Sequence, residues 1–253
     1  MLLILQQLSE DSGLLEWVPH TSTYRDEVLK CYKQYKPWGN GAPSTKDIKD
    51  AAARIKGVDH NQTPQTELRF YKEWLLQRFP PIFHKWHVLK FPTPRQWYEA
   101  RLAYTRTLAV WSMVGHVLGM GDRHGENILL DGKSGGIVQI DFGCLFEKGL
   151  SLEKPELVPF RLTSNMVSAL GASGIEGGFR RSCELTLGLL RANRSVLMVQ
   201  LDANLHDPLI EWKSHSDVTS QNTQQQQVHQ DPFMHKCEYL KQSLLFTLQC
   251  SCY

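Results

Sequence analysis

The spacing of hydrophobic positions along the 253-residue chain predicts a mostly helical domain with a few short strands. The longest periodic segment runs from Pro94 to Leu118, and its nearly apolar second half predicts a buried central helix that ends at Gly119. Further helices are predicted over residues 24–35, 66–79, 164–170, 176–191 and 195–205, with a short one within 45–55. Core positions are expected at Tyr71 and at the stripe Phe179, Cys183, Leu187 and Leu190.

The two ends of the chain have different compositions. Residues 1–18 hold two apolar runs around the polar turn 9–13, which predicts a hairpin. The first of these runs is too short to span a membrane and lacks the features of a signal peptide. Beyond Trp212 the sequence becomes rich in Ser, Thr, Gln and His, which predicts a low-complexity, disordered tail over 214–253.

A second hairpin is predicted in the middle of the chain. Two branched apolar runs, residues 128–130 and 137–140, flank the Asp- and Gly-rich turn 131–136. Antiparallel strands return the chain to its starting end, so Asn127 before the first strand and Asp141 after the second should lie side by side. An amide oxygen beside a carboxylate suits Mg²⁺, which takes one or two protein oxygens together with substrate phosphates.

The loop before this hairpin carries the residues of a phosphotransferase. Asp122 lies five residues before Asn127, the interval between the catalytic Asp and the metal-binding Asn of the protein-kinase catalytic loop. In that template the Asp accepts the proton of the attacking hydroxyl. The order Asp122-Arg123-His124 inverts the usual His-Arg-Asp, so that His124 could donate a hydrogen bond to the γ-phosphate. Each piece alone is common in turns, but the joined spacing favours catalysis.

Composition excludes some classes of function. The hydrophobic content of 42% is enough for a substantial core, in one large domain or two small ones. The net charge of +2, with Lys and Arg scattered, gives no nucleic-acid signal. The six cysteines form neither a CxxC pair nor a disulfide framework, which favours a reducing compartment. A zinc site has irregular spacing and is the weaker interpretation of His229, His235, Cys237, Cys250 and Cys252.

Residues from about Leu8 to Trp212 resemble the hinge and C-lobe of the phosphatidylinositol-3-kinase-related protein kinases, most of all the ATR/Mec-type checkpoint kinases. Three stretches carry the resemblance: PPIFHKW at 80–86, GDRHGENIL at 121–129 and CLFEKG at 144–149. Ser112–Gly115 before the loop and Pro159–Thr163 after it add to it. The pair Gly125-Glu126 favours the ATR type over the TOR kinases, which carry Pro-Ser there.

The resemblance implies an α+β, PI3K/PI4K-type kinase fold: a mostly helical C-lobe with a catalytic-loop β-hairpin, its N-lobe largely missing. In this interpretation residues 1–23 end the N-lobe and form the hinge, and 24–213 are the C-lobe. The catalytic loop would be 119–127 and the activation segment 141–163.

The resemblance also implies roles for eight residues: the catalytic base Asp122, the γ-phosphate partner His124, the Mg²⁺ ligands Asn127 and Asp141, and the adenine-pocket residues Trp17, Val18, Leu129 and Ile140. Trp17 would stack on adenine and the Val18 backbone would hydrogen-bond to it. Leu129 and Ile140 would form the floor of the pocket, although apolar residues of a hairpin belong to the core by default.

The reaction implied is γ-phosphoryl transfer from Mg·ATP to a protein Ser or Thr, in this family typically one followed by Gln. The usual setting is nuclear DNA-damage and replication-stress signalling, with a regulatory partner subunit bound through the N-terminal region. A lipid kinase is the first alternative, but residues 144–158 hold only two lysines against Glu147, Glu153 and Glu156, which favours protein substrates. A non-enzymatic binding module is the second.

The chain departs from the family pattern before the hinge. No Gly-rich phosphate loop precedes Trp17, and no candidate exists for the N-lobe lysine or its acidic partner. The simplest expectation is a fragment or an incomplete gene model. Residues 1–253 alone are therefore expected to have little kinase activity, because the phosphate loop and lysine supply positioning and charge stabilisation.

Overall fold

The computed structural model describes residues 5–7, 12–37, 46, 69, 71–152, 155–156 and 158–205. Most of the short helix expected within 45–55, the start of the helix expected at 66–79, the 214–253 tail and the candidate zinc residues lie outside the described residues.

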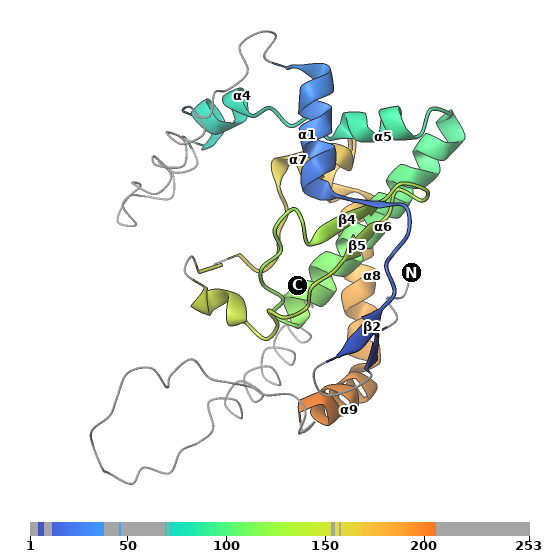
Figure 1. The fold of residues 1–253 in the computed structure, drawn as a ribbon, viewed down its shortest axis with the longest axis vertical. Coiled ribbons are helices and arrows are strands. Elements are labelled where there is room, and N and C mark those ends of the chain that lie inside the picture. The colour runs from blue at the N-terminus through green and yellow to red at the C-terminus, as the bar shows by residue number, and fades with distance from the viewer. Residues whose placement is uncertain are drawn as a thin grey trace, which may run out of the picture.

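The long helix α6, Pro94–Val117, runs through the centre of the described structure (Figure 1). Thr93 caps its N-terminus by accepting a hydrogen bond from the Gln96 N–H, and Pro94 occupies the first turn, where no helical N–H partner is lost. The helix packs most extensively against α8, Gly178–Ala192. Its fully buried face includes Tyr104, which is 0% exposed. The predicted central helix is thus confirmed to within one residue.

A three-stranded antiparallel sheet lies against α6 through its strand β5. Strands β4, Ile128–Asp131, and β5, Ile137–Gln139, form the predicted hairpin. The Asp131 carboxylate closes its turn by accepting hydrogen bonds from the Lys133 N–H (2.9 Å) and the Ser134 hydroxyl (2.6 Å). The third strand, β3, Thr21–Thr23, pairs with β4 and was not predicted.

The N-terminal hairpin is also present, with shorter strands than expected. Strand β1, Leu5–Gln7, pairs antiparallel with β2, Gly13–Leu15. The second apolar run was predicted to extend to Val18, but the strand ends at Leu15.

The remaining described helices are α1 Tyr24–Tyr35, the π-helix η1 Tyr71–Leu75, α4 Leu76–Arg78, α5 His84–Lys90, the 3₁₀-helix η2 Lys148–Ser151, α7 Ser164–Ala169, the 3₁₀-helix η3 Gly174–Glu176 and α9 Arg194–Leu205. Helix α1 has its predicted bounds, while α5 was not predicted. Tyr71 is 37% exposed rather than in the core, because the short η1–α4 unit makes its main described contacts within itself.

The core joins α1, α5 and α6 through aromatic side chains. Phe83 lies between Tyr24 and Trp86, with ring centroids 5.1 and 5.6 Å away. His87, only 1% exposed, packs edge-to-face on Trp86 at 4.9 Å and on Tyr104 at 5.1 Å. Burial lowers the pKa of His87 to about 4, with a smaller contribution from Arg101. The neutral imidazole is therefore a component of the hydrophobic core.

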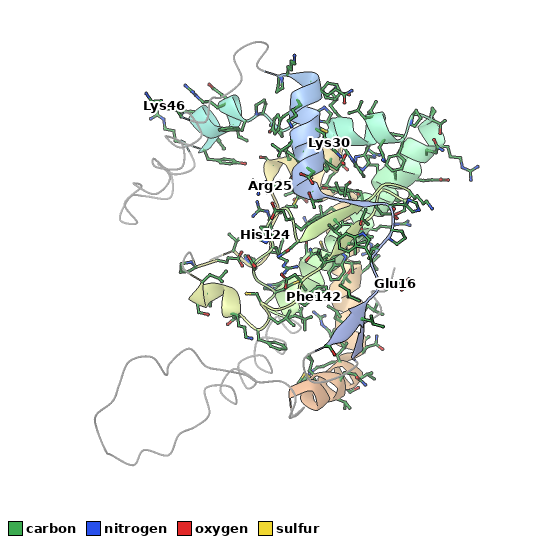
Figure 2. All side chains as sticks on the ribbon, viewed as in Figure 1. Glu16, Arg25, Lys30, Lys46, His124 and Phe142 are labelled. Atoms are coloured by element: carbon green, nitrogen blue, oxygen red, sulfur yellow. The ribbon has the colours of Figure 1, made fainter. Side chains whose placement is uncertain are left out.

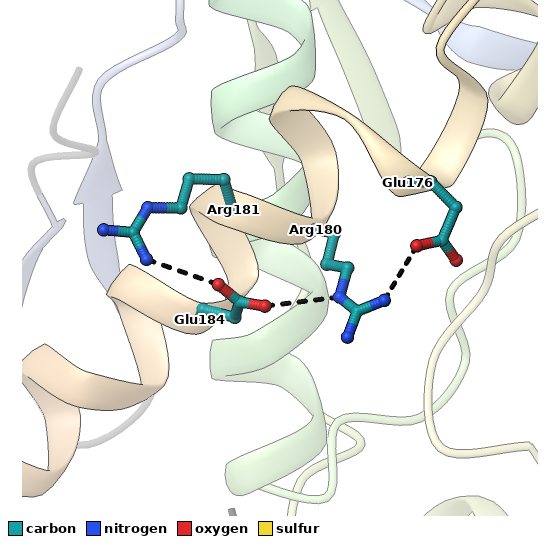
Figure 3. A network of polar contacts seen from close by, with 4 residues as sticks. All are labelled: Glu176, Arg180, Arg181 and Glu184. Atoms are coloured by element: carbon teal, nitrogen blue, oxygen red, sulfur yellow. Dashed lines mark hydrogen bonds and ion pairs between the residues drawn. The ribbon is translucent and has the colours of Figure 1, made fainter.

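Helix α8 divides into a core face and a charged face. Phe179 is buried and Cys183 packs against the core, while Leu187 and Leu190 of the predicted stripe are partly buried. Its charged face carries Arg180, Arg181 and Glu184, which form a chain of ion pairs with Glu176 at the end of η3, in the order Glu176–Arg180–Glu184–Arg181, at 2.8 to 3.3 Å (Figure 3). All four side chains are exposed, and such pairs contribute little to stability. Among the described helices, none is both long enough and apolar enough to cross a membrane.

Candidate active site

Loop 119–127 connects the end of α6 to β4 and holds Asp122 in an unusual backbone conformation. Gly119 leaves the helix with φ +57°, where glycine costs least. Asp122 also has a left-handed φ of 56°, which few non-glycine residues adopt. Conformations of this kind persist when the surrounding contacts determine them, and they concentrate at functional sites.

The buried side chain of Arg123 bonds this loop to the residues that follow β5. Its Nε donates to the Gly121 carbonyl at 2.9 Å, and its two terminal nitrogens donate to the carbonyls of Ile140, at 2.7 Å, and Asp141. Burial lowers the pKa of the guanidinium, while the nearby acids, Asp141 foremost, act in the opposite direction. The charged guanidinium of Arg123 thus holds three backbone carbonyl oxygens in place by donating a hydrogen bond to each.

The two ends of the β4–β5 hairpin meet as predicted. The Ile140 N–H donates to the Asn127 carbonyl at 3.1 Å, so Asn127 and Asp141 lie at the same end of the sheet. The Asn127 side chain is 6% exposed, and its Nδ2 donates to the Asp122 carbonyl at 2.8 Å. Because the amide nitrogen is used in this way, its oxygen is the atom left to face a ligand.

Asp141 completes an oxygen set that fits a magnesium ion. It is exposed, has a left-handed φ of 60°, and accepts from the Gly143 N–H at 3.3 Å. One amide and one carboxylate oxygen are hard ligands, which leave room for the waters and phosphates that Mg²⁺ retains. In the described part of the chain no group of three or more His, Cys, Asp or Glu residues could hold a metal. The donor set therefore suits an ion that arrives with phosphate ligands.

Phe142 anchors the chain directly after Asp141. Its ring stacks on Trp111 of α6, with centroids 5.9 Å apart and planes at 17°, and the Arg123 guanidinium lies 6.0 Å from it. The Trp111 indole N–H in turn donates to the Ile137 carbonyl of β5 at 3.2 Å. Figure 2 shows Phe142 on the ribbon below His124. Asp141 is therefore held between Arg123 on one side and the α6-bound Phe142 on the other.

His124 is exposed and is oriented by its own loop. Its Nδ1 accepts a hydrogen bond from the Glu126 N–H at 3.2 Å. A nitrogen that accepts carries no proton in the neutral ring, so in that tautomer Nε2 carries the proton. The side chain can consequently donate from Nε2 to an anionic group.

The Gly125-Glu126 pair docks the loop onto α1. The Arg25 N–H donates to the Gly125 carbonyl at 2.9 Å, and the Arg25 guanidinium pairs with Glu126 at 2.8 Å. A Cβ at Gly125 would come within 3.1 Å of the Arg25 Cβ, so a larger residue there would require Arg25 to shift. Arg25 and His124 are neighbours in Figure 2.

Three of the four predicted adenine-pocket residues come together. Val18, Leu129 and Val138 form a small buried cluster, with Ile140 packed against it. The Thr21 hydroxyl donates to the Val18 carbonyl at 2.9 Å and fixes that backbone. Trp17, next to this cluster in sequence, is 67% exposed. Core packing of Leu129 and Ile140 agrees with the default expectation, and their contact with adenine stays a prediction.

The charge- and proline-rich sequence of residues 144–159 predicts a mobile segment, yet the described part of this segment is packed against the loop. The N–H groups of Phe146 and Glu147 donate to the carbonyls of Leu118 and Gly119, both at 2.9 Å. Phe146 and Gly149 are buried. Together with the end of α6, this segment lines a cavity of about 270 Å³. Phe146 and Gly149 provide this packing. The prediction missed it because it was based on the many charged residues of the segment.

Comparison with known proteins identifies the family. The sequence model of the family 'Phosphatidylinositol 3- and 4-kinase' matches residues 3–214 of this chain. The chain belongs to this family. It is also homologous to the kinase domains of ATR-type serine/threonine protein kinases.

Relatives and solved structures agree on this kinase family. The chain is 51% identical to the serine/threonine-protein kinase ATR of Arabidopsis thaliana over 222 residues, which cover 85% of this chain and 8% of that protein. It is 48% identical to protein kinase rad3 of Schizosaccharomyces pombe, covering 81% of this chain and 8% of that protein. The solved FAT and kinase domain of CtTel1 matches 92% of the chain, with 35% identity and a TM-score of 0.71, over 15% of its own length. The chain thus spans less than a tenth of these curated relatives.

Several positioning residues of this PI3/PI4-kinase-family site were missed at the sequence level. Val138 could have been found by strand alternation, since it shares a face with Ile140 and pairs with Leu129. Arg123 lies inside the predicted motif but was given no role. Trp111 looked like any other apolar position of a helix. Glu156, whose carboxylate accepts from the Asp122 N–H at 2.8 Å, carried no periodic or motif signal at all.

Proposed function

We propose that this chain forms the hinge and C-lobe of an ATR-type kinase that transfers the γ-phosphate of ATP to protein Ser or Thr, preferentially before Gln. One observation carries the proposal: the closed β4–β5 hairpin puts Asn127 and Asp141 at one end, with the Asn127 amide bonded to the Asp122 backbone. In the proposed division residues 1–23 are the end of the N-lobe and the hinge, 24–213 the C-lobe and 214–253 a disordered tail.

The proposed chemistry assigns one task to each polar group. The Asp122 carboxylate accepts the proton of the attacking hydroxyl, and His124 donates from Nε2 to the γ-phosphate. Asn127 and Asp141 supply the oxygens that would hold Mg²⁺, which neutralises charge on the transferred phosphoryl group when bound. Adenine stacks on Trp17 and bonds to the Val18 backbone, above Leu129 and Ile140. The buried Val18 cluster beside the exposed Trp17 ring supports this pocket.

Charge near the site favours a protein substrate over an inositol lipid. The described part of the segment 144–158 contains one basic residue, Lys148, and two acidic residues, Glu147 and Glu156. Glu156 contacts the loop of Asp122. An inositol phosphate would meet carboxylates here rather than a basic cluster. The similarity to ATR and rad3 supports the same choice. As the resemblance to checkpoint kinases implies, the proposal includes a nuclear role in DNA-damage and replication-stress signalling and a regulatory partner subunit bound through the N-terminal region.

A peptide assay tests the proposed function. The full-length polypeptide that carries these residues is expected to phosphorylate a Ser-Gln peptide with Mg·ATP, and a matched Ser-Ala peptide at least about 10-fold less efficiently, since a site that hydrogen-bonds a substrate group rejects the analogue lacking it. Radiolabel transfer measures both peptides. Vesicles containing phosphatidylinositol serve as the lipid control. Preferential labelling of the lipid would replace the protein-kinase proposal with the lipid-kinase alternative, and transfer to none of them would favour the binding module.

The isolated 253-residue polypeptide provides the complementary arm. It is expected to transfer phosphate no faster than its Asp122→Asn variant, because no Gly-rich loop or lysine precedes Trp17 to hold the phosphates. Clear Ser-Gln peptide phosphorylation by this polypeptide would contradict that expectation.

A further inference from the structure

The backbone of Asp122 is held from both sides by residues outside its own turn. Its N–H donates to Glu156 Oε2 at 2.8 Å, and its carbonyl accepts from Asn127 Nδ2 at 2.8 Å. Asn127 lies five residues away, but Glu156 lies 34 residues further along, in the segment after Phe142. Hydrogen bonds to a carboxylate are stronger than those to a neutral group, so Glu156 supplies the stronger of the two restraints.

The fit around the Glu156 carboxylate is close. A Cβ added at Gly121 would come within 2.9 Å of Glu156 Oε2, and one added at Gly149 within 2.8 Å of the same atom. Two glycines thus approach this oxygen closely, and a Cβ at either one would require the carboxylate to shift. The Glu156 N–H donates to the Gly149 carbonyl at 3.0 Å, so the residue is itself fixed by its segment.

We infer that Glu156 is a positioning residue for the base: its carboxylate holds Asp122 in the left-handed conformation that aims the Asp122 side chain. This inference rests on the proposed kinase function. Left-handed backbone is unfavourable for a non-glycine residue, so Asp122 should relax when the restraint on its N–H is lost. Catalysis then requires the segment containing Glu156 to be ordered, because Asp122 is correctly placed only while this segment is folded against it.

The test compares three variants of the full-length polypeptide that carries these residues. Glu156→Ala removes the acceptor, Glu156→Gln keeps an uncharged acceptor oxygen of the same reach, and Glu147→Gln is the matched control. Glu147 lines the same cavity in the same segment, but the Asp122 N–H donates to Glu156. The readouts are kcat and KM for ATP with the Ser-Gln peptide, and amide hydrogen exchange of loop 119–127.

Glu156→Ala is expected to lower kcat about 10- to 100-fold, as displacement of a reacting group by an ångström does, and to leave KM for ATP within about 2-fold. Exchange in loop 119–127 should become faster in the same variant. Glu156→Gln should recover most of kcat, because its amide oxygen can still accept, and Glu147→Gln should match the wild type. A purely structural role would instead lower the folded fraction and leave kcat per folded molecule unchanged.

The inference is overturned if Glu156→Ala keeps wild-type kcat, if its loss appears only in KM for ATP, or if loop exchange does not change. These results would leave the kinase proposal standing. Absence of transfer by the wild type would instead refute the kinase proposal, and wild-type turnover in Asp122→Asn would remove only the role of Asp122 as the base. Faster loop exchange in Glu156→Ala would then still report the contact, but the assigned role in catalysis would fall with the base.

Discussion

Replacing Asp122 by Asn is expected to lower kcat for the Ser-Gln peptide by about 10²- to 10⁴-fold, the contribution of a positioned general base. The amide cannot accept the hydroxyl proton, yet asparagine tolerates left-handed backbone, so the loop should keep its φ near the observed 56°. Nucleotide affinity should change little, because the residues proposed to hold adenine and Mg²⁺ are untouched. Steady-state kinetics in the full-length polypeptide and fluorescent-nucleotide titration measure the two quantities.

Asp131→Asn is the matched control for this substitution. Asp131 is also an aspartate of the hairpin region, but its carboxylate closes the turn at the opposite end of β4. An asparagine there can still accept from the Lys133 N–H with its Oδ1, and its amide nitrogen can donate to the Ser134 hydroxyl oxygen, so kcat should stay near the wild-type value. Unchanged turnover in Asp122→Asn would remove the role assigned to this residue.

Acid should weaken the folded state through His87. Its pKa in the folded state is about 4, against an ordinary value of 6.5, because burial disfavours the charged imidazolium. The unfolded chain therefore binds the proton first as pH falls. The free energy of unfolding contributed by this residue is fully present above pH 6.5 and is lost towards pH 4, a total of about 3 kcal/mol.

Urea unfolding of the 253-residue polypeptide at pH 7 and pH 4.5, followed by tryptophan fluorescence, measures this loss. Trp86, one of seven tryptophans that contribute to this signal, packs directly on the His87 ring. His87→Leu, which keeps an apolar side chain of similar size and cannot titrate, should show a smaller decrease in unfolding free energy between the two pH values. Equal decreases in wild type and variant would mean that His87 does not control acid stability.

The local pattern of apolar residues and capping residues predicted the helices whose own sequence favours helix formation. Helices α1 and α6 were predicted to within one residue because each has a clear apolar period and a Thr cap. Helix α5 was missed because its seven residues are too few to show a period, and Phe83 gives it no side-chain cap. Strand β3 was missed because Thr-Ser-Thr becomes a strand only through pairing with β4.

The part of the candidate site that depends on the direction of the two hairpin strands could be predicted from the sequence. A hairpin must bring its ends together, so the proximity of Asn127 and Asp141 followed from two apolar runs and a turn. The contact of Glu156 with Asp122 did not follow, because a segment without periodicity can close across 34 residues in many ways. The same limit hid the stacking of Phe142 on Trp111, which joins a loop to the surface of a distant helix.

The sequence by itself determined the chemical groups of this PI3/PI4-kinase-family chain, their spacing, and the main helices and hairpin that carry them. Tertiary structure determined the backbone conformation, the burial and the neighbours of those groups. It placed Asp122 and Asp141 in left-handed conformations, buried Arg123 on backbone carbonyls and surrounded His87 with aromatic rings. The physical reason is that residue type and periodicity act over a few residues, whereas strain, burial and the pKa of a buried group depend on neighbours that only folding brings together.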